Sequence, residues 1–147
     1  KLDIHSIEQP IKAGQWSAMA ELCAETPLPI ALDEELIGLN TDNLKQEMLD
    51  TIKPQYIILK PTLHGALFGV RKWIEEAKKR HIGWWITSAL ESNIGLNAIA
   101  QFCATLNPKI PQGLGTGMLF SDNDNYPLEI RKDCLWYNIK NESWKQL

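Results

Sequence analysis

The sequence predicts an α/β fold of repeated strand–helix units and favours part of a (β/α) barrel over an open, doubly wound sheet. Short, almost continuously apolar segments alternate with longer amphipathic segments along most of the 147 residues. This alternation is typical of parallel strands that are joined by crossover helices and covered on both faces. A chemically distinctive side chain also recurs where each of the first four expected strands ends, every 25 to 27 residues.

The expected strands are apolar segments bounded by residues that interrupt regular structure. Gln9 and Pro10 end the first strand, and Pro29 is tolerated in the second only near its first position. The fifth segment is rich in glycine and has the weakest strand pattern of the five. The expected strands are residues 3–8, 28–33, 55–60, 82–88 and 113–120.

The segments between these strands show apolar residues at helical spacing. Thr41 or Asp42 is the expected N-cap of the second helix. The third ends in basic residues, which the helix dipole favours at a carboxyl end. The expected helices are residues 14–26, 41–52, 66–81 and 95–106, and residues 126–144 are expected to form two further short strands or an extended wrap.

Composition and charge exclude several classes of function. The chain has 15 Lys and Arg residues against 18 Asp and Glu residues, a formal net charge of −3, and nucleic-acid binders usually show a basic excess instead. No apolar run approaches the roughly 18 residues of a membrane span, and the first residues do not form a signal-peptide pattern. Cys23, Cys103 and Cys134 lack metal-type spacing and are expected to be reduced, mostly buried thiols of a cytoplasmic protein.

The side chains at the strand ends decide between the two α/β architectures. In a barrel, the carboxyl ends of all strands meet at one mouth. In an open sheet they spread along an edge, and only those near the switch point meet. Two carboxylates, a lysine and a hydroxyl pair converge more naturally in a barrel, although a doubly wound sheet stays an alternative. These residues are Glu8, Asp33, Lys60, Thr87 and Ser88, and Gly113 opens the fifth strand.

The first three of these side chains suggest a metal site with an acid–base group. Glu8 and Asp33 offer the oxygen ligands that Mg²⁺ prefers, although both could instead be helix caps or solvated loop residues. Lys60, beside such a cation, would have its ammonium form disfavoured and so be suited to proton transfer. The alternative for Lys60 is a buried structural ion pair with Asp33 or Glu8. His64, in the next loop, is expected to be solvated, although it could instead be a lid residue that faces a ligand.

Four segments, in this order, resemble successive strand ends of the enolase superfamily: SIEQP, ALDEEL, ILKPTLHG and TSALESNIGLNAIAQ. Within it, KPTLHG and SALESNIGL are more similar to the o-succinylbenzoate synthases than to the muconate cycloisomerases or dipeptide epimerases. The resemblance implies an N-terminal capping domain, a modified barrel, and a C-terminal segment that returns to the cap. Residues 1–122 would be about the last five strand–helix units of the barrel, and residues 123–147 an extension packing toward the cap.

The resemblance also implies an activity and a cofactor. Members convert 2-succinyl-6-hydroxy-2,4-cyclohexadiene-1-carboxylate to o-succinylbenzoate in menaquinone biosynthesis, with Mg²⁺ stabilising the enediolate formed by proton abstraction. Glu8 and Asp33 match two of the Mg²⁺ carboxylates. Lys60 matches the sixth-strand lysine that stabilises the enediolate.

The resemblance further places Thr87, Ser88 and Gly113 where the family holds the substrate carboxylates, partly through backbone N–H groups. Glu35 departs from the family, which more usually has serine at this position, and this puts the contacts around Asp33 in question.

Two alternatives remain beside the synthase. An N-succinylamino acid racemase or a dipeptide epimerase of the same superfamily would share the metal site, and a non-catalytic half-barrel would bind a partner or a small acid without turnover. The lysine and the carboxylate that the family carries on its second and third strands have no match in the chain. We therefore expect the chain to be inactive alone and to depend on a missing N-terminal part of the same protein.

Overall fold

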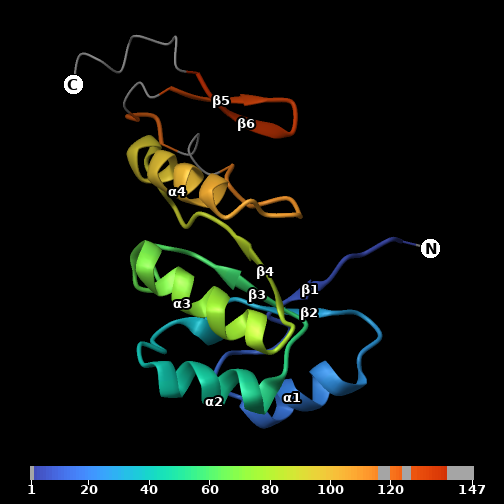
Figure 1. Cartoon of the computed structure of the whole chain (residues 1–147). Helices are drawn as coiled ribbons and strands as arrows, with labels where there is room; N and C mark the ends of the chain where they lie inside the picture. Colours follow the sequence, from blue (N-terminus) through green and yellow to red (C-terminus); the bar gives the residue numbers. More distant parts are fainter. Residues whose placement is uncertain (1, 116–119, 124–126, 139–147) are drawn as a thin grey trace. The chain divides into compact units, whose positions relative to one another are not determined.

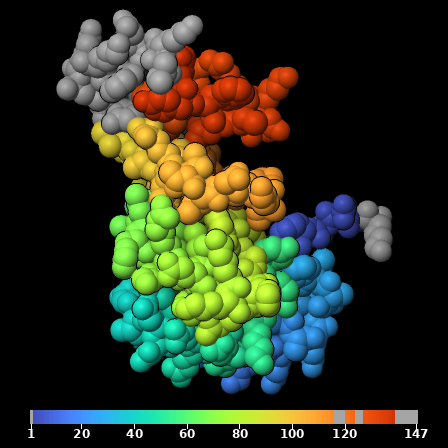
Figure 2. All heavy atoms as spheres, viewed as in Figure 1, coloured from blue at the N-terminus to red at the C-terminus, as the bar shows by residue number. Residues whose placement is uncertain are grey.

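The structure is a computed structural model that describes residues 2–115, 120–123 and 127–138 (Figure 1). The chain divides into two compact units, Lys1–Trp85 and Ile86–Leu147. Figure 2 shows the first unit as a closely packed body from which the residues before the first strand project. Leu2 and Ile4 in that projecting stretch are 85% and 49% exposed.

A parallel sheet forms the centre of the first unit. Its strands are β1 (Ile7–Glu8), β2 (Ile30–Leu32), β3 (Tyr56–Leu59) and β4 (Gly83–Ile86). They lie in the order β1-β2-β3-β4, with β1 parallel to β2 and β2 parallel to β3. A doubly wound sheet reverses its strand order at a switch point. Strands that follow the sequence without reversal are those of a barrel wall, as predicted.

Three helices of the first unit pack in a row along the sheet (Figure 1). They are α1 (Trp16–Glu25), α2 (Asp42–Ile52) and α3 (Ala66–Lys79). Helix α2 packs against both α1 and α3, and α3 contacts β3. The fully buried side chains between these layers include Met19, Leu32, Met48, Ile57 and Trp73. Each apolar side chain of this size contributes about 2 kcal/mol by leaving water.

Local sequence explains how α2 and α3 begin. The Thr41 hydroxyl accepts a hydrogen bond from the Leu44 N–H at 3.3 Å, which confirms one of the two expected caps. Gly65, before α3, has a left-handed backbone with φ of +84°. A Cβ atom at Gly69 would lie 1.9 Å from the carbonyl oxygen of His64, so only glycine lets the first turn of α3 approach the loop that follows β3.

The second unit contains one helix and an antiparallel hairpin. Helix α4 (Asn93–Thr105) is capped by the Ser92 hydroxyl, and β5 (Leu128–Arg131) pairs with β6 (Cys134–Tyr137). These strands confirm the two predicted in the tail, whose last residues lie outside the described ranges. Of the expected fifth barrel strand, one parallel bridge between Thr87 and Gly113 is present. Residues 116–119 of that segment also lie outside the described ranges.

The remaining fold predictions have mixed outcomes. The first strand comprises only Ile7 and Glu8 instead of residues 3–8, since its partner β2 is itself three residues long. Cys23 and Cys103 are buried and Cys134 is exposed, and all three are free thiols. Within the described ranges, no helix has both the length and the apolar character needed to cross a membrane. The boundary expected at residues 122 and 123 stays a prediction.

Candidate active site

Three side chains expected at the strand ends lie at one edge of the parallel sheet. Glu8 is the last residue of β1, Asp33 follows β2, and Lys60 follows β3. Because these strands run in the same direction, their carboxyl ends share one edge. The ammonium group of Lys60 donates a hydrogen bond to Oδ2 of Asp33 and forms an ion pair with it.

Asp33 is the more deeply buried partner of this pair. Its side chain is 1% exposed, against 21% for that of Lys60. Oδ1 of Asp33 is also buried and has no hydrogen-bond partner among the described residues. A buried carboxylate oxygen without a donor is costly, since it has lost water and gained nothing in exchange. The ion pair therefore satisfies only half of this carboxylate.

Glu8 is the third charged side chain at this edge, and its pKa reports desolvation and the negative charge of Asp33 beside it. Although this residue is exposed, partial desolvation raises the pKa of its carboxyl, and the proximity and negative charge of Asp33 raise it further. The positive charge of Lys60 acts in the opposite direction. The negative charge of Asp33 therefore disfavours ionisation of the nearby Glu8 carboxyl.

This arrangement fits a divalent cation. Oδ1 of Asp33 and the carboxylate of Glu8 are hard oxygen donors, and a cation between them would relieve both the missing hydrogen bond and the repulsion. In the part of the chain that the structure describes, no group of three or more His, Cys, Asp or Glu side chains could hold a metal ion. Two carboxylates alone would leave most coordination positions of a cation to water or to other ligands, as Mg²⁺ tolerates.

His64 is a residue of this edge whose role the sequence analysis missed. Its ring Nδ1 accepts a hydrogen bond from the backbone N–H of Lys60 at 3.0 Å. Its backbone N–H donates to the carbonyl oxygen of Lys60 at 3.0 Å. Both backbone polar groups of Lys60 are thus bound by one residue. His64 is 4% exposed, so the expectation of a solvated loop histidine is wrong.

The burial of His64 has a physical cause and an electrostatic consequence. Its ring packs edge-on against Trp73 at 6.5 Å, and Gly69 lets α3 approach its carbonyl group. Burial lowers the pKa of His64 to about 4, with opposing effects of nearby Asp33 and Lys60. The imidazole is therefore neutral near pH 7. The glycines of the segment HGALFG were the signal in the sequence that the loop is tightly packed.

Thr87, Ser88 and Gly113 lie together in the second unit. The carbonyl oxygen of Gly113 accepts hydrogen bonds from the Ser88 N–H at 2.9 Å and from the Thr87 hydroxyl at 2.9 Å. The N–H of Gly113 donates to the carbonyl oxygen of Ile86 at 2.8 Å. The backbone N–H groups of Ser88 and Gly113 thus donate within the chain in this structure, and the contact of these residues with substrate carboxylates stays a prediction.

The family is established by comparison with known proteins. The model of a family described as "Enolase C-terminal domain-like" matches residues 1–136. The chain belongs to this enolase C-terminal domain-like family. The predicted α/β fold with a parallel sheet is confirmed by this membership and by the solved structures that share it.

Individual relatives of this enolase-like chain are longer than the chain itself. The o-succinylbenzoate synthase of Desulfotalea psychrophila is 62% identical over 120 residues, which make up 82% of this chain and 32% of that protein. The crystal structure of MenC from the same organism has a TM-score of 0.87 and 57% identity, covering 90% of this chain and 37% of that one. The chain thus spans about a third of the length of the curated relatives it matches.

A more distant neighbour shares the fold alone. The L-Ala-D/L-Glu epimerase of Bacillus subtilis, solved with its substrate, has a TM-score of 0.77 at 20% identity and covers 91% of this chain. Its chemistry differs from that of a synthase, so the shared fold does not choose between the two activities.

Proposed function

We propose that the protein containing this chain is an o-succinylbenzoate synthase, a carbon–oxygen lyase of menaquinone biosynthesis. The observation that carries the proposal is the 62% identity to a synthase across a segment that places Glu8, Asp33 and Lys60 at one edge of the sheet. Its substrate would be 2-succinyl-6-hydroxy-2,4-cyclohexadiene-1-carboxylate, which loses water to become aromatic o-succinylbenzoate. We also propose that the enzyme acts in the cytoplasm.

Glu8 and Asp33 are the residues that would hold Mg²⁺. When bound, the metal supplies positive charge that stabilises the negative charge developing on the substrate carboxylate. The two side chains come from neighbouring strand ends, so the sheet fixes their separation. The part of the barrel that precedes this chain would supply the remaining protein ligand and the lysine that removes the proton.

Lys60 would stabilise the developing negative charge from the same edge. Its side chain is 21% exposed, so its ammonium group is within reach of a ligand. Asp33 holds that group at the strand end, and His64 fixes the backbone from which it extends. A preorganised ammonium at this point favours the transition state because it need not reorient as charge develops. A cation–π contact with the ring of the substrate would add to the effect.

Two further assignments rest on the resemblance to the family. We propose that Thr87, Ser88 and Gly113 contact the substrate carboxylates. In the chain alone these donors are bound internally, the N–H of Gly113 to Ile86 and the N–H of Ser88 and both hydroxyls to Gly113, so a substrate carboxylate would have to replace one of these bonds. We also propose that residues 123–147 pack toward a capping domain that precedes the barrel.

The test is an assay of the complete protein that carries this chain. Formation of o-succinylbenzoate would be followed with Mg²⁺ or with EDTA, for the wild type and for the Lys60→Ala variant. Turnover that disappears with EDTA and in the variant supports the proposal. A folded protein without turnover overturns it, and exchange of the α-proton of N-succinylamino acids would then identify a racemase or epimerase. Absence of both activities would leave a binding module.

A further inference from the structure

Gln9 and Glu35 form a hydrogen-bonded clamp between the loops that follow β1 and β2. Oε1 of Gln9 accepts the backbone N–H of Asp33 at 3.1 Å and that of Glu35 at 3.4 Å. Nε2 of Gln9 donates to Oε2 of Glu35 at 3.1 Å and to the carbonyl oxygen of Ile11 at 3.0 Å. Oε1 of Glu35 accepts the N–H of Gly14 at 2.8 Å. Each polar atom of both side chains therefore has a partner.

The partners leave only one orientation for the Gln9 amide. Its oxygen faces two N–H donors, and its nitrogen faces a carboxylate and a carbonyl oxygen. Turning the amide over would oppose donors to donors and acceptors to acceptors. Glu35 is 4% exposed, so neither of its oxygens could exchange its partner for bulk water. The clamp is thus fixed in both geometry and polarity.

The backbone of Gln9 gives independent evidence that the clamp holds the chain against its local preference. Gln9 has φ of +35°, in a region that residues other than glycine seldom adopt. It also precedes Pro10, which favours an extended conformation for the residue before it. Such outliers persist where the surrounding contacts impose them, and they concentrate at functional sites. Glu8, one of the two carboxylates of the candidate site, is the residue directly before this outlier.

We propose that Gln9 and Glu35 are positioning residues for the metal site, and that their clamp sets the relative placement of the Glu8 and Asp33 carboxylates. Gln9 follows Glu8 directly in the chain, and its side chain accepts a hydrogen bond from the backbone N–H of Asp33. It therefore contacts both strand ends that carry these acids. Partners that orient metal ligands typically change metal affinity or activity 10- to 100-fold when they are lost. This role also accounts for Glu35 in place of the serine more usual in the family, because the shorter hydroxyl would not bridge Gln9 and Gly14.

The inference rests on the proposed metal site of Glu8 and Asp33, and it depends on the proposed synthase activity only for its turnover measurement. In the complete protein, Glu35→Gln would place an amide N–H₂ against either the Gln9 amide or the Gly14 N–H. Gln9→Glu would oppose two carboxylates. The double variant Gln9→Glu/Glu35→Gln exchanges donor and acceptor across the pair and restores their hydrogen bond, although the new carboxylate then faces the Ile11 carbonyl oxygen, acceptor against acceptor. The four proteins form a double-mutant cycle, in which recovery of Mg²⁺ affinity by the double variant reports the contact between residues 9 and 35.

The control removes a carboxylate of equal charge from the adjacent position. Glu34 is exposed, and Glu34→Gln leaves the clamp intact. Mg²⁺ affinity would be measured calorimetrically without substrate, together with thermal unfolding and with turnover at saturating Mg²⁺. We expect each single clamp variant to bind Mg²⁺ about 10- to 100-fold more weakly. The double variant should recover most of that loss, and Glu34→Gln should stay within about threefold of the wild type.

The Mg²⁺ affinities test the clamp, and the turnover of the wild type tests the proposed function. Folded single variants that bind Mg²⁺ as tightly as the wild type, or a double variant without rescue, overturn the clamp. An equal loss in Glu34→Gln would assign the effect to charge alone and overturn it too. If a single variant fails to fold, Gln9→Met takes its place, because it removes the amide at similar side-chain volume. The same loss of Mg²⁺ affinity is expected for it. If the wild type shows no synthase turnover while the metal pattern holds, the function fails and the clamp stands.

Discussion

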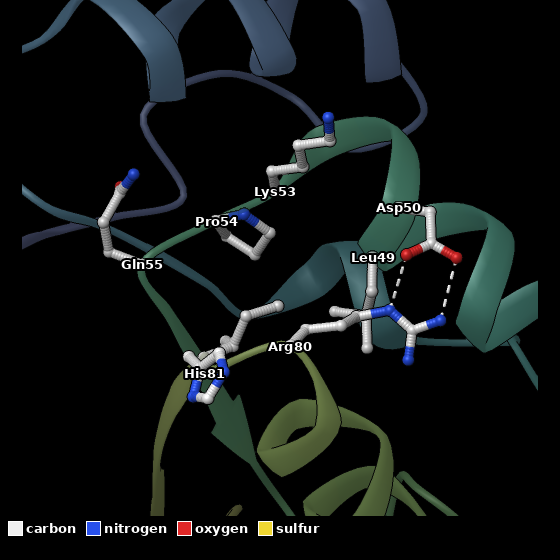
Figure 3. Close-up of a pocket in the computed structure, with 8 residues that line it drawn as sticks. Leu49, Asp50, Lys53, Pro54, Gln55, Arg80 and His81 are labelled. Atoms are coloured by element: carbon white, nitrogen blue, oxygen red, sulfur yellow. Dashed lines mark hydrogen bonds and ion pairs between the residues drawn. The ribbon is translucent and has the colours of Figure 1, made fainter.

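Near the amino ends of β3 and β4, Arg80 is paired with both Asp50 and Glu76, whereas at the carboxyl ends of β2 and β3 the ion pair of Lys60 with Asp33 leaves one carboxylate oxygen without a partner among the described residues. Figure 3 shows the amino end, where Arg80 reaches across to Asp50 beside a pocket of about 400 Å³. Arg80 donates to both oxygens of Asp50, at 2.6 and 2.8 Å, and to Glu76 at 2.7 Å. At the other end, Oδ1 of the buried Asp33 has no partner among the described residues.

The pKa shifts at the two ends follow from this difference. Burial alone would raise the pKa of Glu76, but hydrogen bonds from Lys79 and Arg80 lower it, so the ionised form of this carboxylate is stabilised. The pKa of Glu8 is raised instead, first by desolvation and then by its contact with Asp33. At the carboxyl end a second carboxylate, Glu8, lies near the Lys60–Asp33 ion pair, whereas at the amino end both carboxylates are paired with Arg80.

Whether each charged side chain has a partner distinguishes a structural charge network from a candidate ligand site on the same strands. A network that serves stability satisfies its own members, as Arg80 does for two carboxylates. The proposed ligand site instead leaves Oδ1 of Asp33 without a partner among the described residues and holds Glu8 near a second negative charge. The division agrees with the general behaviour of barrels, whose carboxyl-terminal face carries the chemistry and whose amino-terminal face contributes stability.

The largest expected effect is on turnover at the carboxyl end. Lys60→Ala should lower kcat of the complete protein by about 10³-fold, or about 4 kcal/mol, because it removes a preorganised positive charge. Lys60→Arg keeps the charge but changes its shape and reach, and it should retain more activity than the alanine variant. Equal activity of wild type and Lys60→Ala at saturating substrate would remove Lys60 from the chemistry and leave it as a structural ion pair.

A smaller effect concerns acid stability around His64. Its folded pKa of about 4 lies below the ordinary 6.5, so protonation favours the unfolded chain. The stability that neutral His64 contributes is present above pH 6.5 and is lost as the pH falls toward 4. At pH 5 the free energy of unfolding should be about 2 kcal/mol lower than at pH 8 from this residue alone.

The matched control for this prediction is His64→Asn, measured in EDTA by urea unfolding. Its Oδ1 can accept the Lys60 N–H in place of Nδ1, and the amide does not titrate. The difference between wild type and variant isolates His64 from other groups that titrate over this range. A difference that does not change between pH 8 and pH 5 would show that His64 is not held neutral by burial.

The smallest expected effect is at the amino end. Arg80→Met should lower the free energy of unfolding by about 1–2 kcal/mol, because Glu76 loses one of its two cationic partners while Lys79 remains. Asp50→Asn breaks only the exposed part of the network and should cost less. Urea unfolding of both variants would measure this order. Turnover by either folded variant should match the wild type, and a loss of activity in Arg80→Met would break the proposed separation of the two ends.

Much of this organisation could be predicted from the sequence because it depends on local pattern and spacing. The recurrence of Glu8, Asp33 and Lys60 at the ends of apolar segments was enough to place them at one edge of a parallel sheet. The cap at Thr41 followed from residue type alone. The missed features depend on contacts between loops. His64 is buried because Gly69 admits close packing, and Glu35 is satisfied by Gln9 and Gly14 from a loop more than 20 residues earlier. Spacing alone cannot identify such side-chain contacts.

The most direct test of the difference between the two ends is a calorimetric titration of Mg²⁺ into the complete protein. The wild type, Asp33→Asn and Arg80→Met would be compared under the same conditions. We predict that the wild type and Arg80→Met bind Mg²⁺ with the same affinity and that Asp33→Asn, if folded, loses at least 100-fold, because a charged oxygen ligand is removed. Binding of Mg²⁺ by Asp33→Asn with wild-type affinity would contradict the assignment of the carboxyl end as the metal site.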